Sequence, residues 1–312
     1  MIVRPFASMK TFQQYALGYV DSIGAPIMHA LWPRQPAWAV ASISDMDAAF
    51  FAGLVIETRP AKLVEIGVAS GWGSCVLLEA LDAAGMQKSV LHGVDIAERF
   101  FYDEAYATGQ CVNDVMPERL ARYRLTTGMT AGECAASIGA GVDFAFIDAH
   151  HMHPWATLDL LAIMPIMQPA SWVAMHDINL SRKEDQEHRN RGPKYLFEGW
   201  EGDKMHSTQV PTMAGAIRLP DDPPACLPLL LDILYTPWEL PVDPRQCNAA
   251  TDAVERVYGA TWGAKFRRAC EIGNYHVGKM HSADIDESHR KIAALRGGVR
   301  GWARALFRER NA

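Results

Sequence analysis

The chain has 312 residues, of which 49% are hydrophobic and 21% are charged, a composition that excludes disordered and low-complexity classes. Its 30 basic and 36 acidic side chains give a formal net charge of −6, which argues against nucleic acid as a partner. The charge is uneven, because residues 290–312 hold seven basic side chains and one acidic side chain.

The sequence shows no sign of export or membrane insertion. It contains no run of about 18 apolar residues, so no transmembrane segment is expected. Residues 1–10 lack the pattern of a secretory signal. The cysteines are scattered without close pairs, so we expect a cytoplasmic protein with free, buried thiols at Cys75, Cys111, Cys134, Cys226, Cys247 and Cys270.

The predicted elements begin with one or two short helices over residues 9–32. Ser44 is the predicted N-cap of the next helix, which continues through residues 48–57, because its hydroxyl can accept a free backbone N–H. Short apolar strands then alternate with helices. The strands are predicted at 62–66, 90–94, 123–126, 142–147 and 171–175, and the helices at 74–84, 131–138 and 154–166.

Residues 205–210 and 213–219 flank a Pro-Thr turn and predict a hairpin that closes the sheet. The alternation predicts an α/β fold with a doubly wound, mostly parallel seven-stranded sheet that includes an antiparallel strand. Three segments are expected: an N-terminal helical segment or lid (1–44), the sheet domain (45–220) and a mostly helical C-terminal extension (221–312). In the extension, helices are predicted at 251–258, 264–272 and 284–308.

The strongest local motif is the strand, turn and helix of residues 63–74. Glu65 lies near the end of the strand, and Gly67, Gly71 and Gly73 follow it. This glycine spacing differs from the dinucleotide fingerprint, and the phosphate-loop lysine is absent, so a pyrophosphate ligand is disfavoured. Asp95 ends the second strand, where a carboxylate can accept two ribose hydroxyls.

Together these features resemble the first motifs of class I S-adenosylmethionine-dependent methyltransferases, which have a Rossmann-like fold. The resemblance implies S-adenosylmethionine as the cofactor, bound at the carboxyl ends of the strands. Met129 follows the third strand, where this family usually contacts adenine. By position, the implied cofactor-binding residues are Glu65, Gly67, Ala69, Ser70, Gly71, Ser74, Asp95, Met129 and Asp148.

A second constellation comprises Asp148 to His151 after the fourth strand, Asp159 on the next helix, and His176-Asp177 after the fifth strand. Its order and spacing resemble the small-molecule O-methyltransferase branch of the same class. That branch includes catechol and caffeoyl-coenzyme A enzymes and, more closely, macrolide and aminocoumarin sugar O-methyltransferases. The resemblance implies a small hydroxylated acceptor, such as a sugar or a secondary metabolite.

In those relatives a divalent metal is held at the ends of the fourth and fifth strands. Carried over by position, the ligands are Asp148, His176 and Asp177, and oxygen ligands favour magnesium. His176 stands where the sugar enzymes have a carboxylate, and imidazole favours zinc, iron or nickel, so the metal's identity stays open. His151 matches the proposed general base, because a near-neutral imidazole can accept the proton of a hydroxyl. His151 and Asp148 are the implied catalytic residues.

Other interpretations of the chain stay open. It could be an oxidoreductase of the same fold, similar to cephalosporin hydroxylases, or a non-catalytic binding protein. The charged segment 181–192 is a solvated loop or a lid over the acceptor. Four tryptophans either wall an acceptor pocket or belong to the core: Trp32, Trp38, Trp155 and Trp200.

The pattern of the C-terminal tail, with arginines at 300, 304 and 308, predicts a basic amphipathic helix. It is expected to pack on the body of the protein or on a second copy in a homo-oligomer. Peripheral membrane contact and an exposed tail are the alternatives.

Overall fold

The computed structural model describes residues 9–40, 43–183, 189–208 and 210–277. Within these residues, seven strands form one sheet in the order β3-β2-β1-β4-β5-β7-β6. Strands β1 to β5 are parallel, and β7 is antiparallel to both of its neighbours, as predicted. The bounds are β1 (Lys62–Ile66), β2 (Val90–Asp95), β3 (Tyr123–Thr127), β4 (Val142–Ile147), β5 (Met167–Met175), β6 (Lys204–His206) and β7 (Gly215–Arg218).

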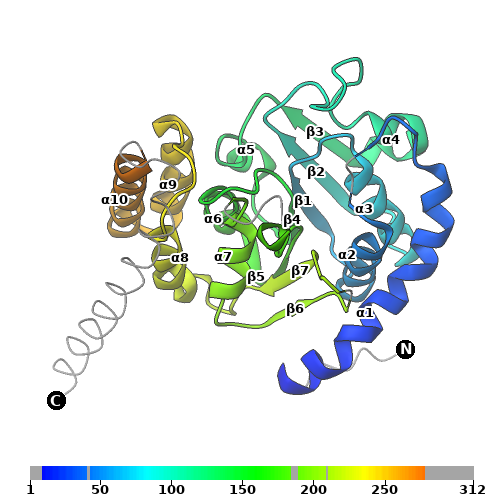
Figure 1. Ribbon diagram of the computed structural model, residues 1–312, viewed down its shortest axis with the longest axis horizontal. Helices are drawn as coiled ribbons and strands as arrows, with labels where there is room; N and C mark the ends of the chain where they lie inside the picture. Colours follow the sequence, from blue (N-terminus) through cyan, green and yellow to red (C-terminus); the bar gives the residue numbers. More distant parts are fainter. Residues whose placement is uncertain (1–8, 41–42, 184–188, 209, 278–312) are drawn as a thin grey trace.

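Helices cover both faces of this sheet (Figure 1). One face carries α1 (Met9–Leu31), α2 (Asp45–Thr58), α3 (Trp72–Ala83) and α4 (Gln110–Val115). The other carries α5 (Ala131–Ile138), α6 (Trp155–Ile163) and α7 (Gly192–Gly199). Beyond them lie α8 (Leu227–Leu234), α9 (Pro244–Tyr258) and α10 (Ala260–Val277). Short 3-10 turns are η1 (Trp32–Arg34), η2 (Pro117–Arg122), η3 (Met164–Ile166), η4 (Leu180–Arg182) and η6 (Pro223–Cys226).

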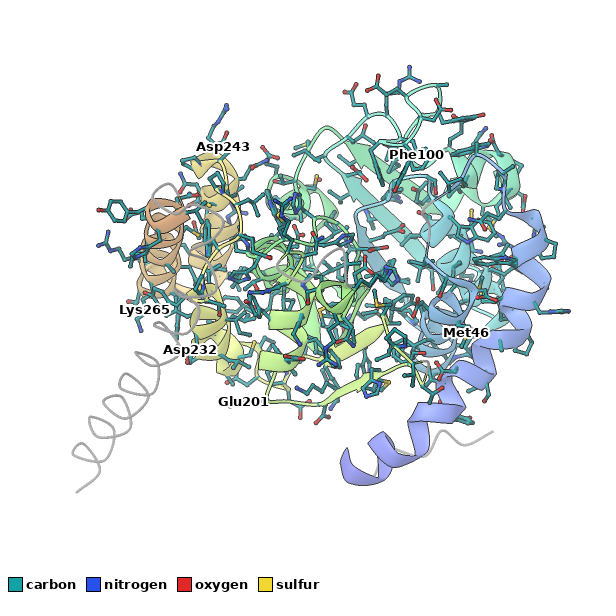
Figure 2. All side chains as sticks on the ribbon, in the orientation of Figure 1. Met46, Phe100, Glu201, Asp232, Asp243 and Lys265 are labelled. Carbon is teal, nitrogen blue, oxygen red and sulfur yellow. The ribbon has the colours of Figure 1, made fainter. Side chains whose placement is uncertain are left out.

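Two apolar cores result from the alternation of side chains along the strands. In β4, Ala145 and Ile147 face the core under α5 and α6, whereas Phe144 and Phe146 face the core under α2 and α3. Side chains fill the space between the sheet and the helices (Figure 2). Because both faces are covered, the central strands are buried and present only their ends to a ligand.

Helices α1 and α2 pack against each other at unusually close range. A Cβ atom at Gly24 would lie 1.8 Å from the backbone oxygen of Ala49, and one at Gly53 would lie 1.9 Å from that of Val20. Helix α2 begins as predicted, since Ser44 Oγ accepts the backbone N–H of Asp47 at 3.1 Å. The close pairing of α1 with α2 therefore requires glycine at both of these positions.

Several boundaries differ from those predicted. Helix α3 begins at Trp72 rather than 74, β5 begins at Met167 rather than 171, and α9 begins at Pro244 rather than 251. Helices α4, α7 and α8 were not predicted, because α4 is short and α8 is almost wholly apolar, without a polar face to reveal its period. The predicted helix at 284–308 and the basic tail lie outside the described residues, and the three-segment division stays a prediction.

The structure also bears on the predictions about the cysteines and about membrane-spanning segments. All six cysteines are buried and unpaired, as predicted. In the described ranges, no helix is long and apolar enough to cross a membrane.

Candidate functional site

The carboxyl ends of β1, β2 and β4 converge because the loop after β1 passes unusually close to β4. Gly67 has a φ of +87°, and its N–H donates to the backbone oxygen of Val94 at 2.9 Å. A Cβ atom at Gly67 would lie 2.3 Å from the backbone oxygen of Asp148. Glycine is therefore required here, because the left-handed conformation and the close approach both exclude a side chain.

A cavity of about 380 Å³, here called the Asp95 cavity, opens at this edge of the sheet. Its lining includes the apolar residues Ala69, Ile96 and Ala149. Its other lining residues include Asp95, Met129, Thr130, Asp148, Trp155 and Asp159. The walls are mainly apolar and carry a few carboxylates, which suits a ligand with a flat ring and a hydroxylated part.

A second, smaller cavity of about 140 Å³, the His151 cavity, lies next to the first. It is lined by polar groups that include Glu65, Ser70, His151, His176 and Asp177. The two cavities share Gly67, Ala69, Phe101, Asp148 and Ala149. A ligand in the Asp95 cavity would therefore meet a ligand in the His151 cavity beside Asp148.

Asp95 ties the glycine-rich loop to the end of β2. Its Oδ2 accepts the backbone N–H groups of Val68 at 2.8 Å and Ala69 at 2.9 Å, and its Oδ1 accepts that of Ala97 at 2.8 Å. A carboxylate has about four lone-pair positions, so these bonds leave acceptor capacity toward the cavity. Asp95 both shapes the loop and faces the space that the loop encloses.

Glu65 is almost completely buried beneath the start of α3. Its carboxylate accepts the hydroxyl of Ser74, whose Oγ also lies 3.1 Å from the hydroxyl of Tyr123. Burial raises the pKa of Glu65 to about 8, despite the bond from Ser74. A Cβ atom at Gly73 would lie 2.6 Å from Glu65 Oε1, so Gly73 leaves room for this carboxyl group.

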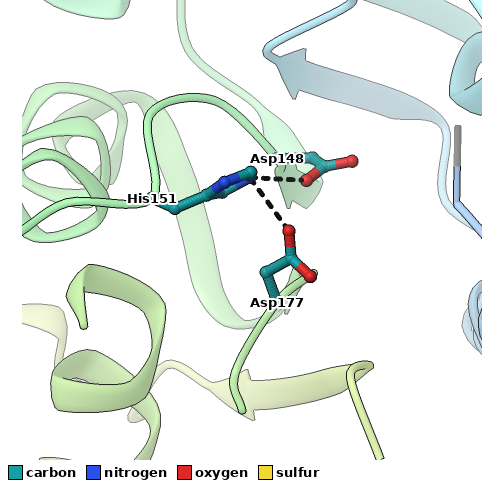
Figure 3. Close-up of side chains that lie close together, drawn as sticks. All are labelled: Asp148, His151 and Asp177. Carbon is teal, nitrogen blue, oxygen red and sulfur yellow. Dashed lines mark ion pairs between the residues drawn. The ribbon is translucent and has the colours of Figure 1, made fainter. Parts of the chain in front are cut away.

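Three side chains from β4, β5 and the loops after them form a cluster (Figure 3). His151 Nε2 lies 3.1 Å from Asp177 Oδ2 and 3.6 Å from Asp148 Oδ1. One potential ligand atom from each of the three lies within 4.8 Å of the others. Asp177 adopts a φ of +58°, a conformation that aspartate tolerates better than most residues.

His176 lies beside this cluster and joins it to α2. Its Nδ1 is 3.3 Å from Asp148 Oδ1 and 3.6 Å from Asp177 Oδ2, while its Nε2 is 3.4 Å from Asp47 Oδ2. Asp47 is buried and also accepts the hydroxyl of Ser44 at 2.7 Å. Both ring nitrogens of His176 therefore face carboxylates, an arrangement that favours the imidazolium form.

The charged groups of this cluster change one another's pKa values. Burial lowers the pKa of His176, but the carboxylates of Asp148 and Asp177 outweigh burial and raise it well above its usual range. Burial also lowers the pKa of His151, and the bond to Asp148 and the charge of Asp177 reverse that and raise it. For Asp148, burial raises the pKa, whereas the two histidines outweigh burial and lower it.

Two carboxylates and an imidazole are a donor set that suits a divalent cation. The three donors that converge on one point are Asp148, His151 and Asp177. The predicted ligand set has His176 in place of His151, and the structure places His176 within reach of the same carboxylates. The structure thus brings the predicted metal ligands and the predicted base together at one place.

The other predicted residues are placed as follows. Gly67, Ala69, Asp95, Met129 and Asp148 line the Asp95 cavity, and Glu65 and Ser70 line the His151 cavity. Gly71 and Ser74 line neither. A Cβ atom at Gly71 would lie 2.8 Å from the backbone of Gly109, so close packing explains why this position is a glycine.

The remaining candidates lie around the cluster. His150 lines the Asp95 cavity and stacks on Trp155, while His153 is fully buried with its backbone N–H bonded to Glu239. Of the four tryptophans, Trp155 alone lines either cavity. The segment 181–192 lies partly outside the described residues. Sequence reasoning missed Asp47 and Phe101, because neither belongs to a motif.

Residues 64–178 match a family model described as a methyltransferase domain. A search of curated proteins finds no significant match to the chain.

Solved structures of several bacterial proteins are similar to the chain at low sequence identity. Cofactor-bound Rv0187 from MTB is 11% identical, with a TM-score of 0.47 over 63% of this chain and 90% of that one. An O-methyltransferase from Bacillus cereus in complex with SAH is 14% identical, with a TM-score of 0.43 over 68% and 98%. The O-methyltransferase TomG from Streptomyces achromogenes in complex with SAM is 14% identical, with a TM-score of 0.42 over 68% and 97%.

The match spans the segment that carries the glycine-rich loop, Asp95, Asp148, His151 and Asp177. It falls on a sheet whose strand order and single reversed strand were described above. Residues 64–178 therefore match a methyltransferase domain, and they form the centre of a mostly parallel, Rossmann-like sheet.

Proposed function

We propose that this protein transfers the methyl group of S-adenosylmethionine to a hydroxyl oxygen of a small molecule. The observation that carries the proposal is the position of Asp148, which lies on the Asp95 cavity and the His151 cavity at once. Two ligands in those cavities would therefore meet beside a carboxylate and within reach of a histidine. The match of residues 64–178 to a methyltransferase domain supports methyl transfer.

The Asp95 cavity is the proposed site of the adenosyl group. Asp95 retains acceptor capacity for the ribose hydroxyls, and Met129, the expected contact of the base, lines the same cavity. The methionine part would pass Gly67 and Ala69 toward the His151 cavity, where Glu65 and Ser70 lie. This path places the positively charged sulfonium beside the carboxylate of Asp148, which favours binding of the charged cofactor over its neutral product.

The His151 cavity is the proposed site of the acceptor hydroxyl. As the oxygen–methyl bond forms, the sulfur–methyl bond breaks and its electron pair stays on the departing thioether. The imidazole of His151 accepts the hydroxyl proton, and Asp177 and Asp148, which lie 3.1 and 3.6 Å from its Nε2, stabilise the resulting imidazolium. Alignment of the two ligands supplies much of the remaining acceleration.

A divalent metal would be held by Asp148 and Asp177, with His151 or His176 as the imidazole ligand. Such an ion lowers the pKa of a bound hydroxyl and orients it. Metal ligation by His151 and proton acceptance by His151 are alternatives, because one nitrogen lone pair cannot serve both.

The test is a methyl-transfer assay with a panel of hydroxylated sugars and phenols, each with and without chelator and added Mg²⁺, Mn²⁺ or Zn²⁺. Once an acceptor is found, His151→Ala should lower turnover by about 10²- to 10⁴-fold while binding of S-adenosylhomocysteine is retained. His29→Ala, an exposed position on α1, is the matched control. Methyl transfer to nitrogen rather than oxygen, or unchanged turnover in folded His151→Ala, would overturn the proposal.

A further inference from the structure

The loop that carries His151 is bound to the C-terminal extension by one residue, Glu239. This residue lies between α8 and α9, and its Oε2 accepts the backbone N–H of His153, 86 positions earlier in the chain, at 2.6 Å. The backbone N–H of Glu239 in turn donates to the backbone oxygen of His153 at 2.9 Å. Glu239 therefore holds both polar backbone groups of His153, two residues after His151.

The same carboxyl oxygen also binds the start of α7. Glu239 Oε2 accepts the backbone N–H of Arg191 at 2.9 Å. The next residue, Gly192, donates its backbone N–H to the backbone oxygen of His151 at 2.7 Å. A Cβ atom at Gly192 would lie 2.8 Å from that oxygen, so a side chain there would push the two segments apart. The loop after β4, the start of α7 and the C-terminal extension therefore form a closed ring of hydrogen bonds.

This ring of hydrogen bonds lies in the interior of the protein. The side chain of His153 is fully buried, and its ring meets that of Tyr195 on α7 edge-on, with 5.3 Å between the centroids. The second carboxyl oxygen of Glu239, Oε1, is buried without a hydrogen-bond partner among the described residues. Burying a carboxyl group costs free energy, and the bonds from His153 and Arg191 offset part of that cost. The carboxyl group of Glu239 is thus an internal support of the loop.

The position of this loop sets the distances within the catalytic cluster. His151 Nε2 lies 3.1 Å from Asp177 Oδ2 and 3.6 Å from Asp148 Oδ1. Gly192 holds the backbone of His151 at its oxygen, and Glu239 holds the loop two residues further on. A shift of the loop by about 1 Å would change both distances, and a misplacement of that size can lower a rate about 10²-fold. Glu239 itself lines neither cavity, so its effect would pass through the loop.

We infer that Glu239 is a positioning residue for methyl transfer, which acts through residues 151–153 to hold the imidazole of His151 against Asp148 and Asp177. The inference rests on the proposed function, which gives His151 its role in the reaction. It assigns part of the catalytic geometry to the C-terminal extension, which lies outside the segment that matches the methyltransferase domain. Both donors to Glu239 Oε2 are backbone N–H groups, so the position requires a hydrogen-bond acceptor of the right length rather than a charge.

The test compares turnover and cofactor affinity in the wild-type protein, Glu239→Ala and Glu239→Gln, with an acceptor found in the panel above. Glu239→Ala should lower kcat by about 10- to 100-fold and leave the affinity for S-adenosylhomocysteine, measured by isothermal titration, unchanged. Glu239→Gln should restore most of kcat, because the amide oxygen can accept both N–H groups. Asp243→Ala is the matched control, since the carboxyl group of Asp243 accepts the backbone N–H of Arg245 at 2.8 Å at the start of α9. That control should retain the wild-type kcat.

The position of the imidazole is also measured without an acceptor, from the NMR signals of the His151 ring at pH 7, assigned by their loss in His151→Ala. These signals should shift in Glu239→Ala and stay near their wild-type positions in Glu239→Gln and Asp243→Ala. Unshifted signals, or wild-type turnover, in folded Glu239→Ala would overturn the role of Glu239.

The outcomes separate this inference from the function on which it depends. Failure of the wild-type protein to bind S-adenosylhomocysteine would overturn the proposed function, and the shift of the His151 signals would then decide the positioning role alone. If Glu239→Ala does not fold, Glu239→Asp takes its place, because its carboxyl group is one carbon shorter and is withdrawn from both donors. It should shift the His151 signals and lower kcat in the same direction, and wild-type behaviour in that variant would overturn the inference.

Discussion

Replacing Glu65 by glutamine should stabilise the protein, and the gain should grow with pH. The carboxyl group of Glu65 is buried, and burial raises its pKa from 4.5 to about 8. The unfolded chain releases this proton near pH 4.5, whereas the folded protein retains it until about pH 8. Between those values the folded state binds more protons than the unfolded state, so the free energy of unfolding falls as pH rises.

The magnitude follows from the width of that window. One pKa unit corresponds to about 1.4 kcal/mol, so at pH 7 the buried carboxyl group costs about 3 kcal/mol. At pH 5 the cost is below about 1 kcal/mol. Glutamine carries no proton to lose and still offers an oxygen to Ser74, so the variant avoids the cost. At about 2 °C per kcal/mol, the melting temperature should rise by roughly 6 °C at pH 7.

The assay is urea unfolding of the wild-type protein and Glu65→Gln at pH 5, 7 and 8. Glu201→Gln is the matched control, because Glu201 is exposed at the surface (Figure 2). The difference between the Glu65 variant and the wild type should increase steadily across the series, while the control difference stays flat. A difference that is constant with pH, or that shrinks as pH rises, would refute the argument that Glu65 is protonated in the folded protein.

Three further predictions concern the loop, the helix start and the base. Gly67→Ala should destabilise the protein by about 3 kcal/mol or more in urea unfolding, because the new Cβ would lie 2.3 Å from a backbone oxygen. A variant as stable as the wild type would contradict the described path of the loop. Ser44→Ala should cost about 1 kcal/mol through the lost cap, checked by the same unfolding, and a neutral effect would show that the cap contributes nothing. With His151 as the base, turnover should rise with pH through a midpoint above 6.5, because the neighbouring carboxylates raise the pKa of His151. A rate that is independent of pH between 6 and 9 would argue against that role.

Much of the fold could be predicted because its central strands are short and mainly apolar. Strands β1 and β4 have the predicted bounds, since strands that are covered on both faces are rich in apolar residues and contrast with the loops around them. The convergence of Asp95, Asp148 and Asp177 also followed from the sequence, because the carboxyl ends of parallel strands meet at one edge. Their order along the chain was enough to place them together.

The contacts that cross between distant elements could not be predicted. The contact of His176 with Asp47 joins residues 129 positions apart and depends on how α2 packs against the sheet. In the glycine-rich loop, Gly71 is required by the backbone of Gly109 and Gly73 by the carboxyl group of Glu65, and neither contact is visible in the sequence. Asp159 belonged to the second constellation, but only the three-dimensional structure shows that this residue lines the Asp95 cavity and that its buried Oδ2 has no hydrogen-bond partner among the described residues.

The central claim is that the Asp95 cavity binds S-adenosylmethionine. Isothermal titration of the wild-type protein with S-adenosylhomocysteine, beside Asp95→Asn and the exposed control Asp114→Asn, tests this claim most directly. We expect one binding site per chain, affinity weakened about tenfold or more by Asp95→Asn, and no change in Asp114→Asn. Absence of binding at millimolar ligand, or equal affinity in all three proteins, would contradict the account.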